Sequence, residues 1–385
     1  MMVTKQKAFF LLALGFVAVH VFIFALLGIR NLFDANGYIS SADFLFANGA
    51  LIDSSHVFYI VPIGLITIFR ALFPGEIIPF LCFQTALSAL ATMYLYRASA
   101  LLFRSTLSGV ITATLFIVWL DVIHWNTVAM TESIFCSLVC FVLYRLVMFE
   151  GRRGDWIVIF VLMVLLFFTR PTSIVVMLGL IVFFLRQYSS LLSSKPIVKV
   201  FVGVFLLAII LVGAYMMFSL WDFTDQYRRG NVITYADVVE GTELSNKGMR
   251  VDTVGVQFQE STAHPLIKMA DFIFQNPIHF AKAGMLKLWY LLSATRPYYS
   301  SMHNVYALCW MLLLYTLAFM GIKRGVSFSL VYAVMGIVVF NCMLIAIGTV
   351  DWDNRFYIPM APGIVLFAGG GGALIMEKLK KVGNI

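Results

Sequence analysis

Uninterrupted apolar runs make up most of this chain, and the short polar segments between them carry most of its charge. Eight runs are long enough for a helix to cross a hydrocarbon core of about 30 Å. Two shorter runs, 156–169 and 173–185, flank Arg170, and another, 57–73, carries Arg70 near its end. The eight long runs are residues 9–29, 77–96, 107–125, 133–149, 197–220, 305–322, 326–349 and 357–376.

The basic residues between the runs predict the orientation of the chain, because short cytoplasmic loops collect Lys and Arg. With all basic clusters inside, 156–169 and 173–185 become two short crossings with Arg170 on the outside. The same rule predicts that 57–73 is an interfacial or re-entrant helix, since the first run leads outward and 77–96 must lead back inward. The basic clusters are Lys5 and Lys7, Arg97 and Arg104, Arg152 and Arg153, Arg186 with Lys195 and Lys199, Lys323 and Arg324, and Lys378 with Lys380 and Lys381.

These assignments predict an all-α polytopic membrane protein with about ten transmembrane helices and both termini cytoplasmic. We expect a single transmembrane domain over residues 1–385 with two outer loops, 30–76 and 221–302. The first loop contains the juxtamembrane helix 57–73. The second contains a predicted amphipathic interfacial helix, 280–292, with Lys282, Lys287 and Trp289. No small-residue cleavage site follows the first run, which predicts a retained signal anchor.

Composition supports the membrane interpretation. Hydrophobic residues are 61% of the chain and charged residues only 12%, against about 45 to 50% and about 25% in soluble domains. The net charge of +8 comes from the basic residues assigned to the inner side, so it reflects membrane orientation and gives no support to nucleic-acid binding.

Acidic and basic side chains gather at the predicted outer boundary, where burying a charge is expensive and therefore suggests function. Asp34 follows the first run, where a helix-end or turn residue is the alternative interpretation. Glu132 precedes an apolar helix, where the helix dipole alone favours an acid and Thr131 or Ser133 is a candidate cap. Arg170 lies at the same boundary, where a snorkelling side chain is the alternative.

Two further features have plainer interpretations. The glycine run 369–372 lies inside the last apolar run without a following Lys-Ser or Lys-Thr, which predicts close helix packing and not phosphate binding. No His and acid spacing predicts a metal site, although Asp351 and Asp353 together would suit a cation. No cofactor is expected.

Five short motifs, distributed over nearly the whole chain, together resemble the GT-C superfamily of integral-membrane glycosyltransferases. The nearest branch is the bacterial members related to protein mannosyltransferases and lipid A aminoarabinose transferases. The motifs are Asp34-x-x-x-Tyr38-x-x-x-Ala42, Thr131-Glu132-Ser133, Thr169-Arg170-Pro171-Thr172, Asn276-Pro277-Ile278-His279-Phe280 and Asn354-Arg355-Phe356-Tyr357-Ile358-Pro359.

This resemblance implies a GT-C-like fold and an inverting sugar transfer from a polyprenyl-phosphate donor at the outer face of a bacterial inner membrane. The acceptor would be an envelope glycan, a lipid or a protein. Asp34 matches the catalytic base, although Ala35 stands where many relatives have a second acid. The candidate ligands of the donor phosphate are Arg355, Arg296 and Arg170, and the candidate supporting residues are Tyr38, His56, Glu132, Asp353 and Tyr357.

The resemblance is weaker after His56, where Val57 and Phe58 replace two prolines of the relatives. A transporter or flippase of a lipid-linked sugar is the rival from another class. Transporters commonly show internal repeats and discontinuous helices at mid-membrane, and the sequence contains no repeated half. An oligosaccharide polymerase or ligase would share the large outer loop.

Overall fold

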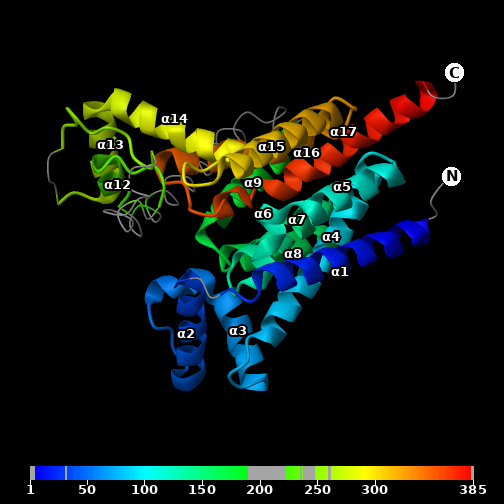
Figure 1. The fold of residues 1–385 in the computed structure, drawn as a ribbon, viewed down its shortest axis with the longest axis horizontal. Helices are drawn as coiled ribbons and strands as arrows, with labels where there is room; N and C mark the ends of the chain where they lie inside the picture. The colour runs from blue at the N-terminus through cyan, green and yellow to red at the C-terminus, as the bar shows by residue number, and fades with distance from the viewer. Residues whose placement is uncertain are drawn as a thin grey trace. The chain divides into compact units, whose positions relative to one another are not determined.

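The computed structural model describes residues 5–30, 33–189, 215, 218, 222–234, 236, 248–258 and 262–382. Every regular element in these ranges is helical, and two isolated β-bridges join Asn231 to Arg250 and Ile233 to Val350. The elements, shown in Figure 1, are α1 Lys5–Leu27, α2 Phe33–Asn48, η1 Ser54–Tyr59, α3 Ile60–Leu72, α4 Ile78–Leu102, α5 Thr106–Val118, α6 Leu120–Ile123, η2 His124–Thr127, α7 Glu132–Val147, α8 Arg153–Phe167, η3 Pro171–Ser173, α9 Ile174–Gln187, α12 Thr224–Arg228, α13 Pro265–Gln275, α14 Pro277–Ser293, α15 Ser301–Ile322, α16 Phe328–Ile347, η4 Arg355–Tyr357 and α17 Ala361–Val382.

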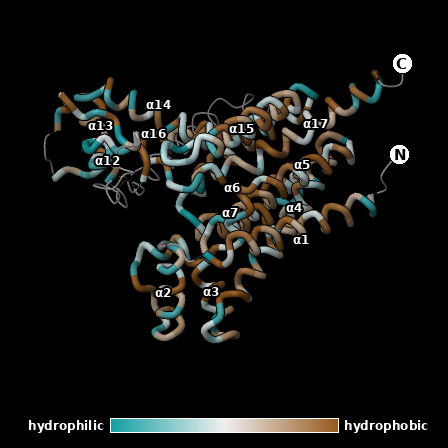
Figure 2. The backbone as a smooth tube through the Cα atoms, viewed as in Figure 1, coloured by the Kyte–Doolittle hydropathy of each residue, from teal (hydrophilic) through white to brown (hydrophobic). Residues whose placement is uncertain are grey.

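Within the described ranges, six helical segments are long and apolar enough to cross a membrane: α1, the continuous Ser54–Leu72 segment of η1 and α3, α4, α15, α16 and α17. Hydrophobic residues run along most of α1 (Figure 2). Its side chains Phe10, Val21 and Leu26 are 67%, 64% and 67% exposed, a pattern that suits lipid and not water. This architecture is that expected of a polytopic helical membrane protein.

The predicted number of about ten crossings stays a prediction. Helix α7 has 16 residues and α8 has 15, and at about 1.5 Å per residue both fall short of a hydrocarbon core of about 30 Å. The apolar helix Pro171–Gln187 is similarly short. The predicted run 197–220 lies outside the described residues, apart from Tyr215 and Phe218.

Contacts divide the chain into two compact units, of which the first comprises Met1–Met177, Leu313–Val334 and Ile358–Ile385. In it, α4 packs against α5 and α7, and α17 packs against α5 (Figure 1). Glycine makes this approach of α17 to α5 possible, because a Cβ on Gly369 would lie only 1.7 Å from the Thr112 hydroxyl oxygen and 2.8 Å from the Ser108 carbonyl oxygen. The helix-packing interpretation of the glycine run 369–372 is confirmed.

A second helix, α2, occupies part of the predicted first outer loop, where the sequence predicted only the helix at 57–73. Helices α2 and α3 lie side by side (Figure 1). The Thr67 hydroxyl donates to the carbonyl oxygen of Ala42 at 3.2 Å, and Arg70 binds both carboxylate oxygens of Asp43 at 2.6 and 3.1 Å. Ser54–Leu72 is long enough to cross, so the expectation that 57–73 does not cross stays a prediction.

The predicted run 107–125 is a broken helix pair and not one straight span. The α5 axis and the following α6–η2 segment are bent by 67° at a single residue of extended backbone. The end of η2 leaves carbonyl groups without helical partners. Nε2 of Gln84 in α4 donates there to the carbonyl oxygens of Trp125, Asn126 and Val128 at 3.2, 2.9 and 2.8 Å. The His20 ring of α1 lies 2.8 Å from Nδ2 of Asn126.

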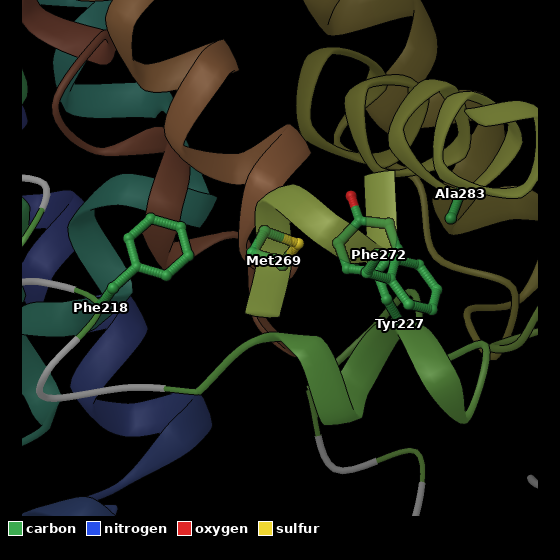
Figure 3. Packing of buried hydrophobic residues seen from close by; sticks show 5 residues of the cluster. All are labelled: Phe218, Tyr227, Met269, Phe272 and Ala283. Atoms are coloured by element: carbon green, nitrogen blue, oxygen red, sulfur yellow. The ribbon is translucent and has the colours of Figure 1, made fainter. Parts of the chain in front are cut away.

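The second unit comprises Leu178–Leu312 and Met335–Tyr357. In it, α13 packs against both α12 and α14. Aromatic and apolar side chains from these helices, together with Phe218, form a buried cluster in which the rings of Tyr227 and Phe272 lie 5.9 Å apart between centroids (Figure 3). The predicted second outer loop therefore contains a folded core. Its buried members are Phe218, Tyr227, Met269, Phe272 and Ala283.

Candidate functional site

Asp34, Tyr38 and Ser41 lie along one face of α2, since they are four and three residues apart. Asp34 is partly exposed in the first turn, where the helix N-terminus stabilises a carboxylate. The rings of Tyr38 and Tyr59 lie 5.5 Å apart between centroids, and the Ser41 hydroxyl oxygen lies 3.2 Å from Nδ1 of His56. The face of α2 that carries Asp34 therefore contacts η1, which carries His56.

The hydrogen bonds of Ser41 determine the tautomer of neutral His56. The single hydroxyl proton of Ser41 is donated to the carbonyl oxygen of Gly37 at 2.8 Å. In the contact with His56 the imidazole Nδ1–H must therefore be the donor, which leaves Nε2 as the acceptor of a neutral ring. The sequence did not single out Ser41, because its one signal is its spacing from Asp34 on a helix, α2, that the sequence did not predict.

Glu132 and Arg170 form a buried ion pair, with Nη1 of Arg170 2.8 Å from Oε1 of Glu132. Their side chains are only 1% and 7% exposed. The Thr131 hydroxyl donates to Oε2 of Glu132 at 3.2 Å and does not cap α7, while the Ser133 hydroxyl donates to Asn126. Two of the sequence motifs thus meet in one pair, in which each charge already has a protein partner.

Asp351, which sequence analysis considered only as a cation ligand beside Asp353, holds the turn that presents Arg355. Its fully buried carboxylate accepts the backbone N–H of Arg355 at 2.5 Å and that of Phe356 at 3.3 Å. The carbonyl oxygen of Phe356 accepts Nδ2 of Asn341 at 2.9 Å. The Arg355 side chain is partly exposed, and its Cζ lies 5.6 Å from the centroid of the Phe356 ring.

Arg296 is buried and directs its guanidinium to protein oxygens. Its Nε donates to the Asp351 carbonyl oxygen at 3.0 Å, and Nη2 lies 3.5 Å from Oδ1 of the same residue. Nη1 donates to the carbonyl oxygens of Tyr290 and Thr295, both at 2.8 Å. The predicted contact of Arg296 with a donor phosphate stays a prediction, and the contacts observed are internal.

The remaining candidates lie around the same turn. Asp353 is partly exposed, and Tyr357 is buried in η4. The Tyr298 ring stacks on Trp352 with centroids 4.0 Å apart, and its hydroxyl donates to the Trp352 carbonyl oxygen. Burial is the main cause that raises the pKa of Tyr298 above its ordinary value, so the hydroxyl keeps the proton that it donates.

Lys287 does not lie on an interfacial face of α14 as the sequence predicted. It is fully buried, with Nζ 2.6 Å from the Gly348 carbonyl oxygen and 3.4 Å from the centroid of the Tyr227 ring. Burial lowers its pKa well below the ordinary value. At about 100° per residue, Lys287 points about 140° away from Lys282 around the helix. The exposed face of α14 carries Ile278, Lys282, Met285 and Trp289.

The predicted site residues fall into two sets, one in each unit. The first set is Asp34, Tyr38, His56, Glu132 and Arg170, and the second is Arg296, Asp353, Arg355 and Tyr357. Within the described ranges, no three His, Cys, Asp or Glu side chains are placed to hold a metal ion. Comparison of the chain with protein-family models, with curated proteins and with solved structures finds no match.

Proposed function

We propose that this protein is an inverting, GT-C-like glycosyltransferase that moves a sugar from a polyprenyl-phosphate donor to an envelope glycan, lipid or protein acceptor. The observation that carries the proposal is Asp34, a partly exposed carboxylate in the first turn of α2, a short link after the candidate span α1. A prenyl donor keeps its tail in lipid and must present its phosphate and sugar at the membrane boundary. A base near the end of a span meets that requirement.

In the proposed reaction Asp34 accepts the proton of the acceptor hydroxyl as its oxygen attacks the anomeric carbon of the sugar. The new carbon–oxygen bond forms on the face opposite the phosphate, so the configuration inverts. The bond between the anomeric carbon and the phosphate oxygen breaks, and polyprenyl phosphate leaves with the bonding electron pair. A positively charged side chain would stabilise the charge that develops on this leaving group.

Burial favours Asp34 over two other acids at the predicted outer boundary. Glu132 and Asp351 are 1% and 0% exposed and lie in ion pairs with Arg170 and Arg296. Asp353 is also partly exposed and is the next candidate base. In the proposal Arg355, the partly exposed arginine of the second set, contacts the donor phosphate, because its planar guanidinium suits phosphate and stays charged beside lipid.

We further infer that the protein resides in a bacterial inner membrane with both termini cytoplasmic and Asp34 on the outer side. The basic clusters between the apolar runs support this orientation. A mass-spectrometric comparison of envelope glycans and lipids, with and without the protein, tests the proposed function. We expect one sugar residue to disappear from one envelope component, which identifies donor sugar and acceptor together. An unchanged envelope composition under conditions in which the protein is produced would contradict the transferase.

The rival function, transport or flipping of a lipid-linked sugar, gains support from one observation. The helix break between α5 and α6, bent by 67°, is the kind of discontinuous helix that transporters use, and the polar side chains of His20, Gln84 and Asn126 meet at the following η2 segment. Purified protein in liposomes separates the two functions. Movement of a polyprenyl-phosphate-linked sugar between leaflets without transfer to any acceptor would favour transport.

A further inference from the structure

The segment that precedes α17 contains Arg355, a candidate ligand for the donor phosphate, and its backbone is held from one side by a buried carboxylate. Both oxygens of Asp351 accept backbone N–H groups, Oδ2 from Arg355 at 2.5 Å and Oδ1 from Phe356 at 3.3 Å. Hydrogen bonds from N–H groups to an ionised carboxylate are among the stronger ones in proteins. Asp351 therefore holds the backbone of the turn that carries the Arg355 side chain.

Asp351 is in turn held by Arg296, which is 55 residues distant in the sequence and equally buried. Four of the five guanidinium N–H groups of Arg296 are directed to protein oxygens, two of them on Asp351. The backbone N–H of Arg296 donates to Oδ1 of Asn304 at 2.9 Å, and Nδ2 of Asn304 donates back to the Arg296 carbonyl oxygen at 2.8 Å. Arg296 is thus anchored on both sides, between α14 and α15.

A neighbouring contact ties the same two segments together. Nδ2 of Asn354 donates to the carbonyl oxygen of Ala294 at 3.0 Å, and both residues adopt positive φ, at 61° and 54°. These conformations are uncommon outside glycine and persist where surrounding contacts determine the backbone. The residue immediately before Arg355 is therefore held to the end of α14 as well.

We propose that Asp351 and Arg296 are positioning residues, which together orient the partly exposed guanidinium of Arg355 toward the phosphate of a polyprenyl-phosphate donor. This inference rests on the proposed function, in which Arg355 contacts that phosphate. Arg296, which the sequence predicted as a direct ligand of the donor phosphate, then acts through Asp351 instead. A carboxylate of fixed position is needed because Arg355 follows a residue with positive φ and projects from a turn of only three residues.

The test measures binding of undecaprenyl phosphate to full-length protein in detergent micelles, by tryptophan fluorescence, at several salt concentrations. Arg355→Ala should weaken binding about 10-fold to 100-fold, the loss expected for one charge-assisted contact, and should reduce its salt dependence. Asp351→Asn keeps the size of the side chain but removes its charge. Made in the parent protein, Asp351→Asn should weaken binding by about 10-fold. Made in the Arg355→Ala variant, it should cause no further loss, because Asp351 acts only through the Arg355 side chain.

Glu377→Gln is the matched control, since Glu377 pairs with Arg324 at 2.9 Å in the other unit and should bind like the parent. If Asp351→Asn does not purify as a folded protein, Arg296→Lys replaces it, with the same expected pattern. The positioning role would be overturned if Asp351→Asn weakened binding equally in the parent and in the Arg355→Ala variant, or weakened it in neither. Failure of both variants to fold would assign the pair to folding and overturn it too.

The outcomes separate this inference from the proposed function. If Arg355→Ala binds undecaprenyl phosphate as tightly as the parent, the assignment of the donor site to Arg355 fails, and the positioning role falls with it. If Arg355→Ala weakens binding while purified Asp351→Asn does not, the donor site stands and only the positioning role is wrong.

Discussion

Arg170 and Glu132 are 38 residues apart in the sequence and form an ion pair of 2.8 Å between Nη1 and Oε1. With exposures of 7% and 1%, the two side chains are shielded from water. The pair joins the start of α7 to the segment before α9, so it has a structural role whatever its part in chemistry. Each charge is tolerated because the other compensates it.

Breaking this pair should destabilise the protein strongly. Glu132→Gln retains the shape of the side chain but leaves the buried charge of Arg170 uncompensated, at a cost of about 3 to 5 kcal/mol. The measurement is the unfolding of purified protein in detergent. Glu377→Gln, whose pair with Arg324 is 39% and 22% exposed, should cost at most about 1 kcal/mol. Similar losses in the two variants would show that burial of the Glu132 pair does not determine its contribution.

Lys287 should make the stability of the protein vary with pH in the neutral to alkaline range. Its pKa in the folded protein lies well below the ordinary value of about 10.4, so between these values the unfolded chain binds a proton that the folded chain does not. Stability should therefore rise with pH through this window. In Lys287→Met, thermal unfolding between about pH 7 and pH 10 should lose that rise, whereas exposed Lys282→Met should keep it. An unchanged pH dependence in Lys287→Met would refute the lowered pKa.

The topology predicts on which side of the membrane the link after α3 lies. A cysteine at Glu76, an exposed position, should react with a membrane-impermeant thiol reagent in intact cells, in a background without the native cysteines. A cysteine at Lys378 should react only after permeabilisation, because the C-terminus is expected inside. Labelling of Glu76→Cys from the cytoplasm alone would make Ser54–Leu72 a true span and invert the downstream orientation.

The sequence predicted the helices that depend on local apolar character. Helices α1, α4, α15, α16 and α17 coincide with long apolar runs, and the close packing around Gly369 follows from a glycine run inside such a helix. It missed α2, which is rich in Asp, Asn, Ser and Gly, residues that favour caps and turns. There the contacts of Asp43 with Arg70 and of Ala42 with Thr67 support a helix that local propensity does not favour.

The other surprises depend on partners far away in the sequence. The break after α5 contains no Pro or Gly, and the carbonyl groups at the end of the η2 segment that follows it are satisfied by Gln84, 41 or more residues earlier. Asp351 was a candidate cation ligand because its actual partner, Arg296, lies 55 residues upstream and could not be recognised from the local sequence. Lys287 matched an amphipathic pattern, but its partners, the Tyr227 ring and the Gly348 carbonyl oxygen, lie about 60 residues away in the sequence in each direction.

The most direct test of the proposed function is sugar transfer by Asp34→Asn in liposomes, with donor binding measured on the same preparation. The donor is the polyprenyl-phosphate-linked form of the sugar identified by the envelope comparison. The amide keeps the size of the side chain but cannot accept the proton, so turnover should fall by about 100-fold to 10,000-fold while donor binding stays like that of the parent. Asp43→Asn and Asp53→Asn, which change acids of the same segment, should keep substantial activity. Transfer by Asp34→Asn at a rate near that of the parent would contradict the assignment of Asp34 as the base.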